Sequence, residues 1–183
     1  MRKLKLDELD RPDLTTYQDT QKLDIVLVLD NIRSGMNVGS FFRTADAFLI
    51  SSIYITGISA TPPHKEIHKT AIGADQSVKW TYFSSVTEAV HDLKAKGYQI
   101  VGVEQADQST LLQEFKPDPG SGIALIFGNE VEGLSDEVME MLDHCIEIPQ
   151  YGTKHSLNVS VSAGIVIWSI FEKLCLKPPY KSI

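Results

Sequence analysis

The sequence predicts a single α/β domain with a mainly parallel sheet, and three observations support this. Short continuous apolar runs, typical of strands buried on both faces, recur from Ile25 onward. Segments with apolar residues at helical spacing lie between these runs. The 183 residues suit one domain, with 43% hydrophobic and 22% charged residues, as is ordinary for a globular protein. These values exclude disorder, collagen and a coiled coil as the main state.

Five apolar runs predict the buried strands of the sheet. They cover residues 25–29, 52–56, 99–103, 123–127 and 145–148. Residues 78–83 instead alternate between apolar and polar side chains, which predicts a half-exposed strand.

Helix signals separate the strands. Residues 38–49 carry apolar side chains at helical spacing. The sequence Ser85-Val86-Thr87-Glu88 has the form of a capping box, and it opens a helix that Gly97 closes. Ser135 is an N-cap candidate followed by acidic residues, and a last long helix is expected over residues 158–174.

The expected organisation is an N-terminal arm over residues 1–24 with one helical turn, a domain over 25–176 and a tail over 177–183. Cys145 and Cys175 cannot form a disulfide framework and are interpreted as small buried hydrophobes. The start of the chain lacks the apolar stretch of a signal peptide. The longest apolar run is too short to span a bilayer, which takes about 20 residues. We therefore expect a cytoplasmic protein with no membrane partner.

The net charge of −7 comes from 24 acidic against 17 basic residues, and the excess is local. Residues 129–147 hold seven acidic side chains and neither Lys nor Arg. The rest of the chain is balanced, so its acidity does not exclude a nucleic-acid partner. A surface that binds phosphate must then be local, because the basic signature of a whole nucleic-acid-binding domain is absent.

Three polar segments follow predicted strands, where ligands bind in parallel α/β sheets. The first, residues 30–45, holds Asn37 and Arg43 six positions apart, and Gly39, which lets another backbone come close. Asn37 and Arg43 indicate a functional site, or else Asn37 caps the helix and Arg43 is a solvated helical residue.

The second and third segments likewise allow either a functional or a purely structural interpretation. In residues 127–135, two glycines flank acidic side chains. Such a segment is either a ligand-binding loop or a plain turn. Residues 148–164 form a polar loop that enters a helix rich in small residues. Ser156 or Asn158 can cap this helix, and its small residues permit close packing against another element.

Signals for other cofactors and for metals are missing. No G-x-G-x-x-G sequence follows the first strand, and Gly152-Thr153-Lys154 lacks the upstream glycine of a P-loop. The five histidines show no metal-ligand spacing with the cysteines, so no metal site is expected. Residues 64–69 are interpreted as an exposed basic helix that either touches phosphate or is simply solvated.

Together, and in this order, the three segments resemble the motifs of the SpoU (TrmH-like) branch of the SPOUT RNA 2′-O-ribose methyltransferases. The first motif, N-x-G-x-x-x-R-T-A, is matched by Asn37, Gly39, Arg43, Thr44 and Ala45. The second, F-G-N-E-x-x-G-L, is matched from Phe127 to Leu134, and the third, I-P-M-x-G-x-x-x-S-L-N-V-S-V-A, from Ile148 onward. Gln150 and Ser162 depart from the third motif, where Met and Ala are usual, and Gln150 is expected to alter the cofactor pocket slightly. The resemblance covers roughly residues 25–175.

The resemblance implies a mainly parallel sheet flanked by helices, with a C-terminal trefoil knot formed between the second and third motifs. The small residues compatible with such close threading are Gly128, Gly133, Gly152, Ala163 and Gly164. Members of the family are typically homodimers with the last helix near the interface. An apolar stripe on that helix either meets a second copy or packs on the sheet of its own subunit; it comprises Val161, Ile165, Trp168 and Phe171.

The resemblance also implies S-adenosyl-L-methionine as the methyl donor and RNA as the acceptor, through a ribose 2′-hydroxyl. The matching cofactor positions are Val103, Gly128, Ile148, Ser156 and Leu157. Displacement at a methyl carbon that a sulfonium already activates requires no metal. The protein must hold the hydroxyl in line with the methyl group and help to remove its proton.

Arg43 is the catalytic candidate that the resemblance supplies. An arginine is an awkward base, because its pKa lies above about 12. Either Arg43 loses a proton transiently, or it stays charged, binds an RNA phosphate and orients the hydroxyl. Asn37 would position Arg43 or the ribose, and Glu130 and Asn158 would order the site, with Ser156 supporting the cofactor loop.

Within the family we expect tRNA rather than ribosomal RNA as the substrate, because the chain leaves no room for the separate N-terminal RNA-binding domain of many ribosomal-RNA members. The basic candidates for RNA contact are Arg33, Lys65, Lys69 and Lys154 in the domain, and Arg2, Lys3, Lys5 and Arg11 in the arm. One alternative is a non-catalytic RNA-binding module on the same fold, which the intact Asn37 and Arg43 disfavour. Another is an α/β oxidoreductase, which the missing glycine fingerprint disfavours.

Overall fold

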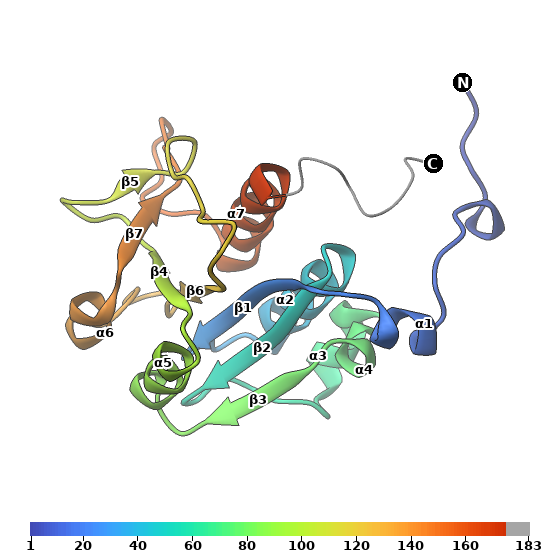
Figure 1. Cartoon of the computed structure of the whole chain (residues 1–183), viewed down its shortest axis with the longest axis horizontal. Helices are drawn as coiled ribbons and strands as arrows, with labels where there is room; N and C mark the ends of the chain where they lie inside the picture. The colour runs from blue at the N-terminus through green and yellow to red at the C-terminus, as the bar shows by residue number, and fades with distance from the viewer. Residues whose placement is uncertain (175–183) are drawn as a thin grey trace.

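The computed structural model describes residues 1–174 and is built around one parallel β-sheet flanked by helices (Figure 1). In chain order the elements are η1 (Leu6–Glu8), α1 (Leu14–Asp19), β1 (Leu23–Asp30), α2 (Gly35–Ala47), β2 (Ile50–Thr56), α3 (Lys65–Ala71), α4 (Ala74–Ser77), β3 (Trp80–Phe83), α5 (Val86–Ala95), β4 (Gln99–Val103), β5 (Thr110–Leu111), β6 (Ile123–Phe127), α6 (Asp136–Met141), β7 (His144–Glu147) and α7 (Val159–Leu174). Within the described residues the sheet has seven strands in the order β3-β2-β1-β6-β4-β7-β5, with parallel neighbours throughout. The predicted α/β class is confirmed.

The buried strands follow the apolar runs closely. β4 and β6 occupy the predicted ranges, and β1 and β2 each begin two residues earlier. All five residues of β6 and the last six of β1 are buried, because helices cover both faces of the sheet. β3 has no buried residue, as its alternating sequence predicts.

Alternate side chains of β1 enter two separate cores. Ile25, Leu27 and Leu29 join the core that α2, α3 and α7 cover. Val26 and Val28 join the core that α5 and α6 cover. Since successive strand residues point to opposite faces, the two groups of helices lie on opposite sides of the sheet (Figure 1).

Capping side chains begin the helices as the sequence predicts. Ser85 accepts a hydrogen bond from the Glu88 N–H at 3.2 Å at the start of α5, and Ser135 accepts from the Val138 N–H at 3.4 Å at the start of α6. At α7 the choice between two candidates is settled. Asn158 Oδ1 accepts from the Ser160 N–H at 3.0 Å, so Asn158 caps the helix and Ser156 does not.

The small residues differ in how closely they pack. A Cβ added at Gly39 would lie 2.5 Å from the Ile67 carbonyl oxygen, and one at Gly128 would lie 2.4 Å from the Gly133 carbonyl carbon, so backbones approach closely there. A Cβ at Gly152 or Gly164 would meet no atom within 4 Å. Within the described chain, no other element packs closely against these two glycines. The trefoil knot stays a prediction.

The apolar stripe of α7 does not pack on the sheet of its own subunit. Val161, Ile165 and Trp168 are 51%, 39% and 52% exposed, whereas the buried residues of the helix are Ala163, Val166, Ile167 and Ile170. Phe171 is half-buried against Phe48, which ends α2, with ring centroids 5.2 Å apart. The alternative in which the stripe covers the sheet is thus wrong for its three exposed members.

The N-terminal arm contains η1 and α1, and Tyr17 of α1 is buried. Cys145 is half-buried, and its thiol donates to the Glu104 carbonyl oxygen at 3.5 Å. Cys175 and the predicted tail over 177–183 lie outside the described residues.

Candidate active site

The first polar segment turns sharply at Asn31 before it enters α2. Asn31 has a left-handed backbone with φ of 53°; its Nδ2 donates to Asp30 Oδ1 at 2.8 Å, and its Oδ1 accepts from the Ile58 N–H at 3.1 Å. Ser34 then caps α2, because its hydroxyl accepts from the Asn37 N–H at 3.3 Å. The alternative in which Asn37 caps this helix is therefore wrong, and its side chain makes other contacts.

Asn37, Glu130 and Asn158 join the three polar segments through their side chains. Asn37 Nδ2 donates to Glu130 Oε1 at 2.9 Å, and Asn158 Nδ2 donates to Asn37 Oδ1 at 3.3 Å. The backbone N–H groups of Arg33 and Ser34 donate to Glu130 Oε2 and Oε1 at 3.1 and 3.4 Å. Three of the four predicted catalytic positions thus share one hydrogen-bonded cluster.

Two opposing effects set the pKa of the Glu130 carboxyl. Partial burial raises it, whereas hydrogen bonds from Asn37 and from the Arg33 and Ser34 backbone lower it. The hydrogen bonds prevail, so the pKa of Glu130 lies below its usual value. The carboxylate is therefore charged at neutral pH beside the start of α2, where the helix dipole also favours a negative charge.

The loop after β6 is a tightly built turn. Asn129 and Gly133 exchange two backbone hydrogen bonds of 3.2 and 2.9 Å, and Gly133 has a left-handed backbone with φ of 69°. Asn129 Nδ2 also donates to the Asn31 carbonyl oxygen at 2.8 Å. The turn is therefore tied to the first segment and holds Glu130 in place.

A cavity of about 780 Å³ opens at the carboxyl ends of β4, β6 and β7, beside the loop that precedes α7. This volume is within the usual range for a small-molecule site. All five predicted cofactor positions line the cavity, namely Val103, Gly128, Ile148, Ser156 and Leu157, and Glu130 and Asn158 line it as well. Gln150 and Ser162, the two departures from the third motif, also lie in its wall.

The cavity wall is acidic. Among the described residues it holds neither Lys nor Arg, but five carboxylates, which belong to Glu104, Glu130, Glu132, Asp136 and Glu147. Walls that carry one sign of charge concentrate ligands of the opposite sign. The cavity therefore favours a ligand with positive charge and disfavours a phosphate.

Arg43 lies apart from the hydrogen-bonded cluster. Six positions separate it from Asn37, which places the two side chains about 120° apart around α2. Arg43 is exposed and does not line the cavity, and within the described part of the chain it has no hydrogen bond or ion pair. Its guanidinium is thus available to a ligand that approaches from solvent.

The predicted RNA contacts are exposed but scattered. Lys65 and Lys69 lie on α3, Lys154 lies in the loop before α7, and Arg33 lies two residues before α2. In the arm, Arg2 forms an ion pair with Glu8 at 2.7 Å. Lys3, Lys5 and Arg11 are exposed.

Sequence reasoning missed two residues of the site. Glu104 Oε2 accepts from the Leu134 N–H at 3.1 Å, and Gln105 Nε2 donates to the His155 carbonyl oxygen at 2.9 Å. These bonds hold the second and third segments around the cavity. The available signal is their position directly after Val103, the last residue of β4.

Among the described residues, no group of three or more His, Cys, Asp and Glu side chains is arranged to hold a metal ion. None of the helices described within residues 1–174 combines the length and the apolar character that a membrane span requires.

Residues 24–168 match the model of the SpoU rRNA Methylase family. The chain belongs to this family. Among its SpoU-family relatives, one from Staphylococcus saprophyticus, named as a TrmH family tRNA/rRNA methyltransferase, is 34% identical over 152 residues, which cover 83% of this chain and 60% of the relative. The 23S rRNA (guanosine-2′-O-)-methyltransferase RlmB of Neisseria meningitidis is 32% identical over 153 residues, covering 84% and 60%. The chain thus spans about 60% of the length of these relatives.

Solved structures of the SpoU family share the fold. A TrmH/SpoU tRNA modifying enzyme of A. aeolicus has a TM-score of 0.77 and 26% identity, covering 87% of this chain and 80% of that one. An AdoMet-bound rRNA methyltransferase of Sinorhizobium meliloti has a TM-score of 0.77 and 26% identity, covering 86% and 60%.

Proposed function

We propose that the chain is an S-adenosyl-L-methionine-dependent RNA methyltransferase that modifies a ribose 2′-hydroxyl. The observation that carries the proposal is the Asn37–Glu130–Asn158 cluster, which joins the three family motifs beside a cavity that all five expected cofactor positions line. The 2′-O-methyltransferase relative from Neisseria meningitidis supports the choice of acceptor.

The cavity residues fit the proposed cofactor. The cofactor carries a sulfonium, an ammonium and one carboxylate group, and the five carboxylates of the wall complement its net positive charge. Val103, Ile148 and Leu157 supply apolar contacts, and Gly128 and Ser156 supply backbone groups. The AdoMet-bound Sinorhizobium meliloti structure supports the same assignment.

The chain's own residues must position the acceptor, since the cofactor, when bound, supplies a methyl group already activated by a positive sulfonium. Glu130 accepts three protein hydrogen bonds, which occupy most of the roughly four acceptor sites of a carboxylate. We therefore assign Glu130 the ordering of the start of α2 rather than the removal of a proton. The guanidinium of Arg43, which has no partner among residues 1–174, is the group that meets the ribose or its phosphate.

We favour tRNA as the substrate class. This chain matches 80% of the length of the A. aeolicus tRNA modifying enzyme, whereas it matches 60% of the length of the RlmB relative. Within the domain, the basic candidates for RNA contact are Arg33, Lys65, Lys69 and Lys154.

We also propose a homodimer that forms through α7. Val161, Ile165 and Trp168 expose apolar surface along one side of the helix, and Gly164 beside them has open space around it. A second copy would bury this stripe and fill the space at the glycine.

The proposed function is tested by two assays. Calorimetric titration with S-adenosyl-L-methionine should show binding that a chelator does not change. Purified tRNA and ribosomal RNA are then incubated separately with methyl-labelled cofactor, and label is expected in tRNA. Cofactor binding without transfer to either RNA would favour a non-catalytic RNA-binding module.

A further inference from the structure

A second hollow, of about 560 Å³, lies beside α3 and shares no lining residue with the acidic cavity. Its walls include Trp80, His64, Lys65, His68 and Asp75. We propose that this hollow holds a second, unpaired nucleotide of the RNA substrate, with its base stacked on Trp80 and its phosphate beside His64 and Lys65. The inference rests on the proposed function, because it takes RNA as the substrate.

Trp80 supplies the stacking surface. It is the first residue of β3, it is half-buried, and one part of it packs against the main core, so its indole is held in place. Every base has a face that can stack on an aromatic ring, so such a site accepts single-stranded RNA with little sequence preference. A fixed, partly exposed indole in a hollow suits an unstacked base better than a duplex.

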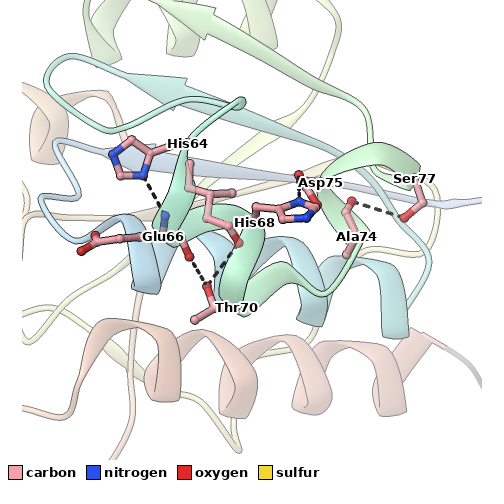
Figure 2. A network of polar contacts seen from close by, with 8 residues as sticks. His64, Glu66, His68, Thr70, Ala74, Asp75 and Ser77 are labelled. Carbon is pink, nitrogen blue, oxygen red and sulfur yellow. Dashed lines mark hydrogen bonds and ion pairs between the residues drawn. The ribbon is translucent and has the colours of Figure 1, made fainter.

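The histidines of the hollow have fixed orientations. His64 Nδ1 accepts from the Glu66 N–H at 3.3 Å, so the proton of the neutral ring lies on Nε2 and can be donated to a phosphate oxygen. His68 faces Asp75 of α4 (Figure 2), and its Nδ1 lies 3.3 Å from Asp75 Oδ2. The exposed amine of Lys65 adds a positive charge beside His64.

The charge distribution favours the α3 side for the RNA backbone. Lys65 and Lys69 are both exposed on α3 and Lys79 is exposed directly before β3. The acidic cavity, by contrast, has five carboxylates and neither Lys nor Arg among its described wall residues. Across α3, α4 and residue 79, three lysines exceed the two carboxylates of Glu66 and Asp75, so this side suits a phosphate better than the acidic cavity does.

The hollow is also next to the candidate active site. His64 Cε1 and Nδ1 lie 2.9 Å from the position that a Cβ would take at Gly35. The preceding residue, Ser34, donates its N–H to Glu130. One RNA strand can therefore place one nucleotide at the cavity and a nearby one in the hollow.

The first test measures the Kd of the full chain for a fluorescent eight-nucleotide oligoadenylate RNA. Trp80→Ala is expected to raise the Kd at least about fivefold, because one stacked base contributes at least this much to binding. Trp80→Phe keeps an aromatic ring and should change the Kd less than about twofold. Lys65→Ala should also weaken binding. The matched control is Lys94→Ala, an exposed lysine of α5 on the opposite face of the sheet, which should leave the Kd unchanged.

The second test uses intrinsic fluorescence and needs no destabilising variant. The oligoadenylate should quench the tryptophan emission of the wild-type chain, and Trp80→Phe should remove this quenching. Quenching that persists in Trp80→Phe would come from Trp168 and would contradict the proposal. AMP that binds as tightly as the oligonucleotide would show a free-nucleotide site instead.

Activity separates this inference from the proposed function. In the methylation assay, Trp80→Ala should raise the KM for RNA by the same factor as the Kd and leave kcat nearly unchanged. A folded Trp80→Ala protein with wild-type Kd and KM would contradict the proposed nucleotide site in the hollow. It would leave the proposed methyltransferase function untouched. A wild-type chain that binds the oligonucleotide but methylates no RNA would contradict the proposed function and leave the hollow supported.

Discussion

Glu130 links charge to stability at the scale of a single residue. Because its pKa is lowered in the folded chain, the carboxylate stabilises the fold above the unfolded pKa of about 4.3, and this contribution is lost as the pH falls through the lower folded value. Glu130→Gln should therefore reduce the free energy of unfolding at pH 7. We expect less than about 1 kcal/mol, since solvent screens this exposed group.

Urea denaturation of the wild type and of Glu130→Gln at pH 7 and pH 3 checks this effect. The difference between the two proteins should shrink at pH 3. An equal difference at both pH values would show that the charge of Glu130 does not contribute.

Arg43 is expected to act on the acceptor and not on the cofactor. It is exposed and lies outside the acidic cavity, so Arg43→Ala should abolish methyl transfer and leave cofactor affinity nearly unchanged. Arg43→Lys keeps the charge but loses the planar fork. If the fork orients the RNA, or if Arg43 is the base, Lys should fail almost as badly as Ala.

Transfer rates and calorimetric cofactor affinities of both variants check the assignment. A tenfold weaker cofactor affinity, about 1.4 kcal/mol, in folded Arg43→Ala would mean that Arg43 belongs to the cofactor site. Substantial activity in Arg43→Lys would mean that the charge alone is sufficient.

The resemblance to the SpoU motifs predicted Asn37, Glu130 and Asn158, because each lies in a segment that matches one of these motifs. Glu104 and Gln105 lie in none of these motifs. Their bonds reach partners 30 and 50 residues along the chain, and only the folded sheet brings these partners together. The choice between Ser156 and Asn158 as the cap of α7 likewise needed the backbone geometry.

At the scale of elements, the contact between α2 and α3 depends on Gly39. A Cβ at this position would lie 2.0 Å from Thr70 Oγ1 and 2.5 Å from the Ile67 carbonyl oxygen. Because the second neighbour is backbone, Gly39→Ala should force the helices apart and cost about 1–3 kcal/mol.

Thermal or urea unfolding of Gly39→Ala measures this cost. Gly152→Ala is the matched control, because a Cβ there would meet no atom within 4 Å, and its effect should stay within about 0.5 kcal/mol. Equal stabilities of the two variants would contradict the packing argument.

Elements with long periodic patterns were predictable, and the shortest ones were not. β6 is entirely buried, so its sequence is a continuous apolar run whose ends coincide with the strand. β5 has two residues and α4 has four, which is too short for either a strand or a helix period to emerge. Tertiary contacts define them, β5 through its pairing with β7.

At the scale of the whole molecule, the exposed stripe of α7 predicts a dimer. Light scattering should give about twice the 20.3 kDa chain mass at micromolar concentrations. Val161→Glu should shift the mass toward the monomer, because the interface would have to bury a charge. Ile72→Glu, at an exposed apolar position after α3, should leave the dimer intact. A wild-type mass near 20.3 kDa would contradict the dimer.

The central claim, methyl transfer to a ribose 2′-hydroxyl, is tested most directly by locating the transferred methyl group. RNA is labelled with methyl-labelled cofactor and the full chain, and is then hydrolysed in alkali, which needs a free 2′-hydroxyl to cut the strand. The account predicts label in alkali-stable dinucleotides for the wild type and none for Arg43→Ala. Label in mononucleotides would place the methyl group on a base and would contradict the account.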